Sequence, residues 1–166
     1  MKVMSRWGKN VNLKSPLQEY PRMQLQRGSY TNLNGYWEYQ ITDTDQVPQA
    51  DLWKPINVPF PLGSQLSGSD EILLPDKVLW YKKQFSYKPG EYHTYLNFEA
   101  VDQQCIVYLN GIEVGRHIGG YEPFSLDISS YIKYQNALLV KCTDPSDTGE
   151  YAYGKQKIQH GGMWYP

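Results

Sequence analysis

The sequence predicts an all-β protein, an antiparallel sandwich of short strands, and three observations carry this prediction. Apolar and polar residues alternate on seven short segments, and a period of two is typical of half-buried strands. Asn110-Gly111 separates two of these segments, and Asn-Gly favours a two-residue hairpin because both turn positions need positive φ. No stretch has the apolar spacing of an amphipathic helix.

The chain has 166 residues, the size of one domain. Residues 1–30 show little periodicity, and we expect an extended arm there, followed by one domain over residues 31–166. Strands are expected at 36–42, 78–87, 94–99, 103–109, 112–117, 123–128 and 137–143. Two further stretches, 43–77 and 144–166, are rich in Pro and Gly. Loops of this length usually have a function or pack on another element.

Each strand is justified by the residues on its apolar face. Residues 103–109 place Cys105, Val107 and Leu109 on one face, and the chain returns after the turn through Ile112 and Val114. The aromatic residues expected in the core are Trp37, Tyr81, Phe85, Phe98 and Phe124. The aromatic residues expected to face a ligand or another domain are Trp80, Tyr121, Tyr151, Tyr153, Trp164 and Tyr165.

Composition excludes several classes of function. A net charge of −1 gives no electrostatic basis for binding nucleic acid or an anionic membrane. No apolar run approaches the roughly 20 residues of a membrane helix, and the N-terminus lacks the apolar centre of a secretory signal, so we expect a cytoplasmic protein. Cys105 and Cys142 lie in predicted strands and are expected to be buried thiols, because no Cys or His has the spacing of a zinc site.

A series of motifs resembles the N-terminal sugar-binding domain of glycoside hydrolase family 2, which includes β-galactosidases, β-glucuronidases and β-mannosidases. In chain order the motifs are Tyr20-Pro21-Arg22, Leu33-Asn34-Gly35-Tyr36-Trp37, Asn57-Val58-Pro59-Phe60-Pro61, Leu79-Trp80-Tyr81-Lys82-Lys83-Gln84-Phe85, Asp144-Pro145-Ser146-Asp147, Gly154-Lys155-Gln156 and Gly161-Gly162-Met163-Trp164-Tyr165. Tyr153 and Met163 depart from the residues common in the family. The resemblance implies a jelly-roll sandwich similar to galactose-binding domains.

The resemblance also implies what surrounds this domain in a parent enzyme. Family members continue with a further strand, an immunoglobulin-like domain and a catalytic barrel that carries both catalytic Glu residues. We therefore expect a fragment that is inactive alone, with no catalytic residue of its own. We also expect an unpaired edge near Met163-Trp164-Tyr165 that could self-associate, because open strand edges recruit other strands.

Four residues are the candidate substrate contacts. The resemblance places Asp147 where β-galactosidases have an acid that contacts the sugar and a bound cation, and Lys155 and Gln156 at the mouth of the active site. It places Gln65 where an amide meets the sugar. A carboxylate can accept two hydroxyls or ligate Na⁺ or Mg²⁺, but Asp-Pro-Ser-Asp-Thr-Gly is also ordinary turn chemistry.

The expected function is accordingly that of a non-catalytic accessory domain of a retaining glycosidase. The parent would cleave terminal β-linked sugars, with β-galactosides favoured. The expected partners are a carbohydrate and the parent's own barrel and immunoglobulin-like domain. The fragment itself needs no cofactor, and Na⁺ or Mg²⁺ would be bound in the parent's active site. Two alternatives stay open, an autonomous carbohydrate-binding module and a purely structural interaction domain.

Overall fold

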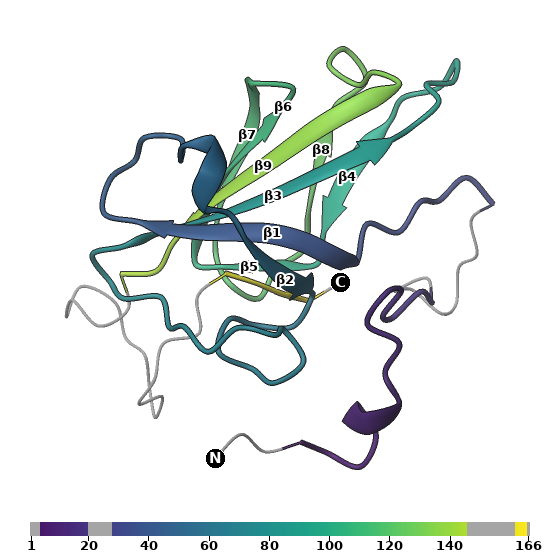
Figure 1. The fold of residues 1–166 in the computed structure, drawn as a ribbon. Coiled ribbons are helices and arrows are strands. Elements are labelled where there is room, and N and C mark those ends of the chain that lie inside the picture. The colour runs from purple at the N-terminus through teal and green to yellow at the C-terminus, as the bar shows by residue number, and fades with distance from the viewer. Residues whose placement is uncertain (1–3, 20–27, 146–161, 166) are drawn as a thin grey trace.

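The computed structural model of the chain describes residues 4–19, 28–145 and 162–165, of which 162–165 are described by their backbone alone. It is an all-β sandwich in which every strand pairing is antiparallel (Figure 1). The helices that it describes are two 3-10 turns of three residues, η1 (Gly8–Asn10) and η2 (Ala50–Leu52), and neither has the length or apolar character needed to cross a bilayer.

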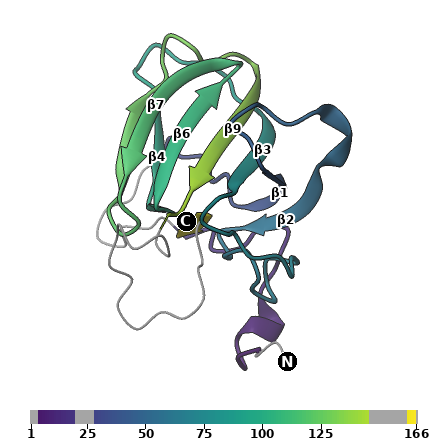
Figure 2. The ribbon, with the colours of Figure 1, turned by 90° about the vertical axis from the view of Figure 1, so that its left-hand side faces the viewer.

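One layer is a six-stranded sheet in the order β2-β1-β3-β9-β6-β7. The second layer is formed by two strand pairs, β4-β8 and β5-β10 (Figures 1 and 2). The strands are β1 (Gly35–Thr42), β2 (Lys54–Val58), β3 (Val78–Ser86), β4 (Tyr95–Phe98), β5 (Ala100–Asp102), β6 (Gln104–Leu109), β7 (Ile112–Ile118), β8 (Phe124–Asp127), β9 (Gln135–Thr143) and β10 (Gly162–Tyr165).

The core lies between the two layers and follows the alternation of the sequence. Val107 and Val140 from the large sheet and Leu96 and Val101 from the opposite layer belong to one buried cluster. Trp37, Tyr81 and Phe98 are buried as predicted, and Phe85 and Phe124 pack against this cluster while remaining partly exposed. Both cysteines are buried and free, as predicted. The all-β jelly-roll sandwich expected from the sequence is therefore confirmed.

The Asn-Gly hairpin is also confirmed. Asn110 and Gly111 have φ of 54° and 84°, and Leu109 pairs with Ile112 across a two-residue turn. The Asn110 side chain fixes this turn to its neighbours, because its amide donates to the Tyr131 carbonyl at 2.9 Å and its oxygen accepts from Ala137 N at 3.0 Å. The turn is thus held by tertiary hydrogen bonds as well as by its own backbone preference.

Three expectations were wrong in detail. Residues 54–58, expected in a long loop, form the edge strand β2, which tolerates Pro55 because one side of an edge strand needs no ladder bonds. Residues 100–102, which lie between two expected strands, form a further strand, β5. Gly162–Tyr165, where an unpaired edge was expected, forms β10 and pairs with β5 on one side. Residues 146–161, which precede β10, lie outside the described residues.

Trp80 was expected to face a sugar or another domain, and this expectation was wrong. The side chain is only 1% exposed although it lies on the outer face of the sheet. Its indole N–H donates to Thr42 Oγ1 at 3.1 Å, and its ring stacks on Tyr108 at 6.3 Å between centroids. Tyr121, by contrast, is 74% exposed, as its expected role requires.

Candidate functional site

The four predicted substrate contacts fall in two loops. Asp147, Lys155 and Gln156 lie outside the described residues. Gln65 is described, and its exposed side chain lies on the loop that joins β2 to β3. Figure 1 shows this loop at the lower end of the sandwich, where β5 and β10 also lie. This end is the candidate functional site.

The Gln65 loop is folded onto the sandwich by its own turns and by buried side chains. Gly63 and Gly68 have φ of 79° and 82°, which L-residues rarely adopt. Asn57 N donates to Ser67 O at 2.9 Å, so the loop runs back along β2. Leu62 joins the core cluster from this loop. The loop is therefore a packed part of the domain, and Gln65 is presented from a fixed support.

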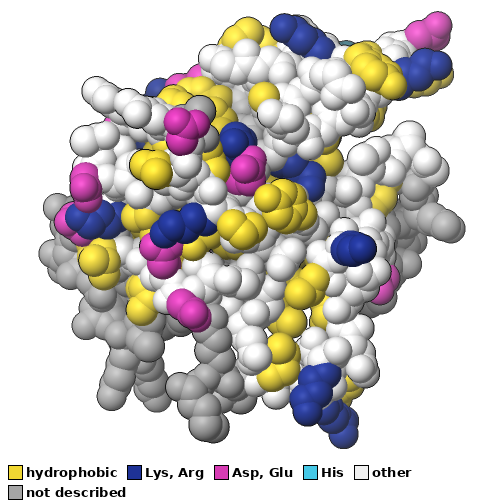
Figure 3. Space-filling view, viewed as in Figure 1, with side chains coloured by type: hydrophobic (Ala, Val, Ile, Leu, Met, Phe, Trp, Pro, Cys, Tyr) yellow, Lys and Arg dark blue, Asp and Glu magenta, His cyan; other side chains and the backbone are white. Residues whose placement is uncertain are grey.

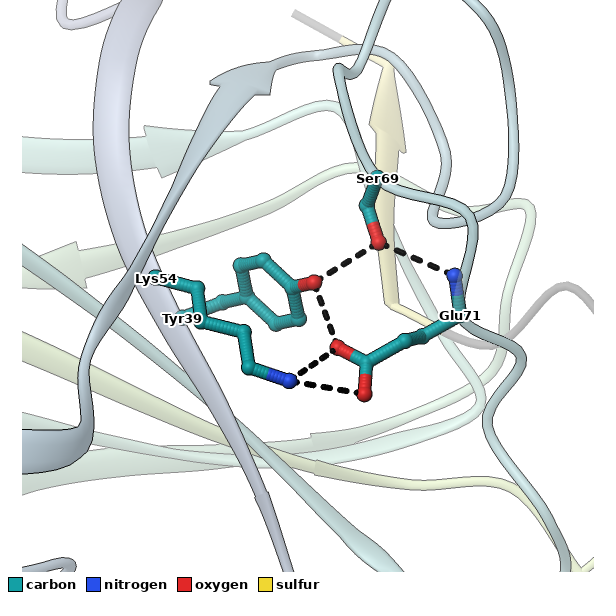
Figure 4. A network of polar contacts seen from close by, with 4 residues as sticks. All are labelled: Tyr39, Lys54, Ser69 and Glu71. Atoms are coloured by element: carbon teal, nitrogen blue, oxygen red, sulfur yellow. Dashed lines mark hydrogen bonds and ion pairs between the residues drawn. The ribbon is translucent and has the colours of Figure 1, made fainter.

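A polar network anchors the far end of this loop (Figure 4). Tyr39, on the inner face of β1, donates its hydroxyl to Glu71 Oε2 at 2.5 Å and lies 2.8 Å from Ser69 Oγ. Ser69 Oγ accepts from Glu71 N at 3.1 Å. Lys54 of β2 donates to both Glu71 oxygens at 2.9 Å. One carboxylate thus joins two strands to the loop.

The network changes the protonation behaviour of its members. Burial and the adjacent Glu71 raise the pKa of Tyr39 to about 12, so its hydroxyl remains a donor at neutral pH. Hydrogen bonds from Tyr39 and Lys54 lower the pKa of Glu71. A lowered carboxyl pKa contributes stability above the unfolded-state pKa, and this contribution is lost as the pH falls through the folded-state value.

We expect Tyr39→Phe to loosen the Gln65 loop without unfolding the domain. The substitution keeps the ring in the core but leaves Glu71 without one charge-assisted hydrogen bond, which should cost about 1–2 kcal/mol. Hydrogen exchange of the Ser69 and Glu71 amides should accelerate, while exchange in β6 and β9 should change little. Equal acceleration throughout the sheet would show that Tyr39 supports the whole core and not this loop.

A second feature of the same end is a pair of acidic side chains, Asp102 at the end of β5 and Asp144 just after β9. Asp144 is only 2% exposed. The Asp102 carboxyl packs against the Cα of Gly120, where any added Cβ would overlap it. Burial, and secondly the charge of Asp144, raise the pKa of Asp102 to about 6. Asp144 directly precedes the segment that holds Asp147, so the pair lies at the base of the predicted substrate loop.

This arrangement can accept hydrogen bonds and change charge near pH 6, but its chemistry is limited. Retaining hydrolysis needs two carboxyls about 5–5.5 Å apart on either side of a bound glycosidic bond. Here, Asp144 is enclosed by the fold and cannot flank a substrate. Across residues 4–19, 28–145 and 162–165, no group of three or more His, Cys, Asp or Glu side chains could hold a metal ion.

Sequence reasoning named the Gln65 loop but missed the groups that fix it. Tyr39 only alternates with polar neighbours in the predicted strand 36–42, which gives no sign of a polar role, and Glu71 lies in a stretch without periodicity. Asp102 gave no local signal at all. Asp144 carried one, since it opens the Asp-Pro-Ser-Asp motif, but its burial depends on how β9 meets β5.

Comparison with known proteins identifies the family of this chain. Residues 66–163, more than half of the chain, match the family profile described as glycosyl hydrolase 2 galactose-binding domain-like. The match includes the Ser69–Glu71 anchor, β3 to β9 and both members of the acidic pair.

Individual relatives are glycosidases of two kinds. A β-galactosidase of Thermoanaerobacter pseudethanolicus is 48% identical over 63 residues, covering 36% of this chain and 8% of that protein. A β-glucuronidase of Bacteroides fragilis is 25% identical over 119 residues, covering 68% of this chain and 16% of that protein. The chain therefore spans less than a fifth of either relative.

Solved structures agree on the fold. The crystal structure of Ruminococcus gnavus β-glucuronidase aligns with a TM-score of 0.60 at 21% identity, over 72% of this chain and 22% of that one. At this identity the likeness supports the sandwich architecture and nothing finer.

Proposed function

The chain belongs to glycoside hydrolase family 2 through its galactose-binding-like domain, and on this premise we propose that it is the non-catalytic sugar-binding domain of a larger retaining glycosidase. The observation that carries the proposal is the family match over residues 66–163, together with relatives that are several times longer. In this proposal the domain supports the catalytic barrel of its parent and contributes loop residues to the rim of the substrate pocket.

The rim would be formed by the lower end of the sandwich. Gln65 stands on a loop held by Tyr39 and Glu71, so little backbone ordering is needed on binding, and its amide can donate to and accept from sugar hydroxyls. Asp147, Lys155 and Gln156 would complete the rim. If the parent's pocket contains Na⁺ or Mg²⁺, Asp147 is the side chain of this chain that would reach it.

The substrate would be a terminal β-linked sugar. Relatives named β-galactosidase and β-glucuronidase both match, so the two sugars are equal candidates on similarity alone. We retain β-galactosides as the first expectation and β-glucuronides as the alternative. Assays of the parent with nitrophenyl β-galactoside and β-glucuronide decide between them.

The proposal predicts that the isolated chain turns over neither substrate and that the parent does. In the parent, Asp147→Ala should lower kcat/KM by about 10- to 100-fold, because losing a hydrogen bond from a charged group costs on the order of 1.5–3 kcal/mol. The melting temperature should change little.

Asp51→Ala is the matched control, since Asp51 is an exposed acid on the separate turn η2, and its kinetics should be those of the parent. Unchanged kinetics of Asp147→Ala with a lowered melting temperature would make Asp147 a turn residue and remove it from the rim. Turnover by the purified isolated chain, free of host glycosidase, would overturn the non-catalytic role.

A further inference from the structure

A cavity of about 390 Å³ opens beside β4, and Gln65 is not among the residues that line it. It lies between residues 29–34, which lead into β1, and residues 87–99, which include β4. Figure 3 shows the surface hollowed on the right-hand side of the molecule, beside the N-terminal arm. The function proposed above makes no use of this cavity.

The cavity adjoins the Gln65 loop without including Gln65. Val58, the last residue of β2, lines the cavity and directly precedes that loop. Leu138, near the start of β9, also lines the cavity, whereas Thr143 at the other end of β9 leads into the segment that holds Asp147. A strand advances about 3.3 Å per residue, so a ligand on Leu138 would lie about 16 Å from the start of that segment.

The floor of the cavity is apolar. It is formed by side chains that face the core, namely Trp37, Phe85, Leu96, Phe98 and Leu138. The Trp37 indole N–H, the one polar group among these side chains, already donates to Leu33 O at 2.8 Å. A hydroxyl-rich ring pushed onto this floor would leave its hydroxyls without partners, which is costly. The floor thus favours an aromatic or alkyl group.

The rim of the cavity is polar and aromatic. Tyr95 is 54% exposed and stacks with His93 at 6.2 Å between ring centroids. Asp127 fixes His93 through a 2.7 Å contact to Nδ1, so this pair of rings is oriented before any ligand arrives. Tyr87 and Glu99 also line the cavity. Flat aromatic faces beside hydrogen-bonding groups suit a sugar ring, which has apolar faces and polar edges.

We propose that this cavity binds an aryl or alkyl glycoside, with its apolar aglycone on the floor and its sugar against Tyr95 at the rim. A volume at the low end of the range for ligand pockets suits a single sugar with a small aglycone. The choice of a sugar as the polar part of the ligand rests on the proposed function. The choice of an apolar group for the other part rests on the floor residues alone.

The test is a calorimetric and NMR titration of the chain with phenyl β-D-galactopyranoside, galactose and phenol. Phenyl galactoside should bind saturably with a dissociation constant on the order of 0.1–1 mM. Galactose and phenol should each bind at least about tenfold more weakly, because each uses half of the site. Amide shifts should concentrate in β4 and the start of β1.

Tyr95→Ala should weaken phenyl galactoside about fivefold, as expected for the loss of one ring contact. Tyr36→Ala is the matched control, because Tyr36 is a 60% exposed strand tyrosine that does not line the cavity, and it should leave the affinity unchanged. Both substitutions replace exposed side chains, so both variants should fold.

Four results would overturn the proposal: no saturable binding, galactose binding as tightly as phenyl galactoside, phenol binding as tightly as phenyl galactoside, or shifts centred on the Gln65 loop. These outcomes are separate from failure of the proposed function, which is judged by the kinetics of Asp147→Ala in the parent.

Discussion

Gly35→Ala should lower the stability of the domain by about 2–5 kcal/mol. Gly35 is buried at the start of β1 with φ of 106°, a conformation that L side chains rarely adopt. A Cβ there would also lie 2.8 Å from the Lys14 carbonyl oxygen, which is backbone and cannot swing aside. Strain and overlap therefore add. Urea denaturation followed by tryptophan fluorescence measures the loss.

Gly111→Ala separates the two causes. Gly111 also has positive φ, 84°, but an added Cβ would meet nothing within 4 Å. Strain alone should cost about 1–2 kcal/mol. If Gly35→Ala cost no more than Gly111→Ala, the Lys14 segment would be yielding to the new methyl group, and the arm would not be firmly seated against β1.

Gly35→Ala should also affect the N-terminal arm, which lies next to Gly35. Asn32 Nδ2 donates to Leu17 O at 2.9 Å, so hydrogen bonds from the segment before β1 hold the arm next to Gly35. A methyl group that pushes Lys14 away should strain these bonds as well. Faster hydrogen exchange of the Lys14 and Ser15 amides in Gly35→Ala would accompany the loss of stability.

Asp102→Asn should stabilise the domain at pH 7.5 by about 1–3 kcal/mol and have little effect at pH 4. The folded-state pKa of Asp102 is raised to about 6, whereas the unfolded chain titrates near 3.9. Between these values the unfolded chain ionises while the folded chain keeps its proton. The wild-type contribution is therefore favourable below about pH 4 and is lost as the pH rises through 6. Asn carries no charge at either pH, so it removes the free-energy cost of ionising a buried carboxyl at pH 7.5.

Asp127→Asn is a control of opposite sign. Hydrogen bonds from Ser129 and His93 lower the pKa of Asp127 to about 2, so its carboxylate stabilises the fold above the unfolded-state pKa and loses this effect in acid. Its replacement should therefore lower stability at pH 7.5. Urea unfolding at pH 4, 5.5 and 7.5 compares the three proteins. Parallel stability profiles for wild type and Asp102→Asn would show that Asp102 does not titrate in this window.

Elements with strong local patterns were predictable from sequence. In β6 the residues Cys105, Val107 and Leu109 alternate without interruption, and all three are buried. Asn110-Gly111 predicts the hairpin turn from its two residue types alone. Such elements are determined by neighbours one or two positions away, because side chains of a strand point alternately to its two faces.

The candidate site was predictable only in part. Motif similarity pointed to the Gln65 loop and to Asp147, because a motif can be recognised from the order of its residue types alone. It could not show that Glu71 joins Lys54 of β2 to Tyr39 of β1. These three residues come from two strands and a loop, and no periodicity links them.

By itself, the sequence determined that the chain is an antiparallel sandwich, where its hairpin turns and which family it resembles. Only the tertiary structure decided that Trp80 is buried on the outer face, that Pro55 lies in an edge strand and that Asp102 meets Asp144. The physical reason is the range of the interactions. Alternation and turn preference act within a few residues, whereas burial and charge coupling depend on which distant segments the closed sandwich brings together.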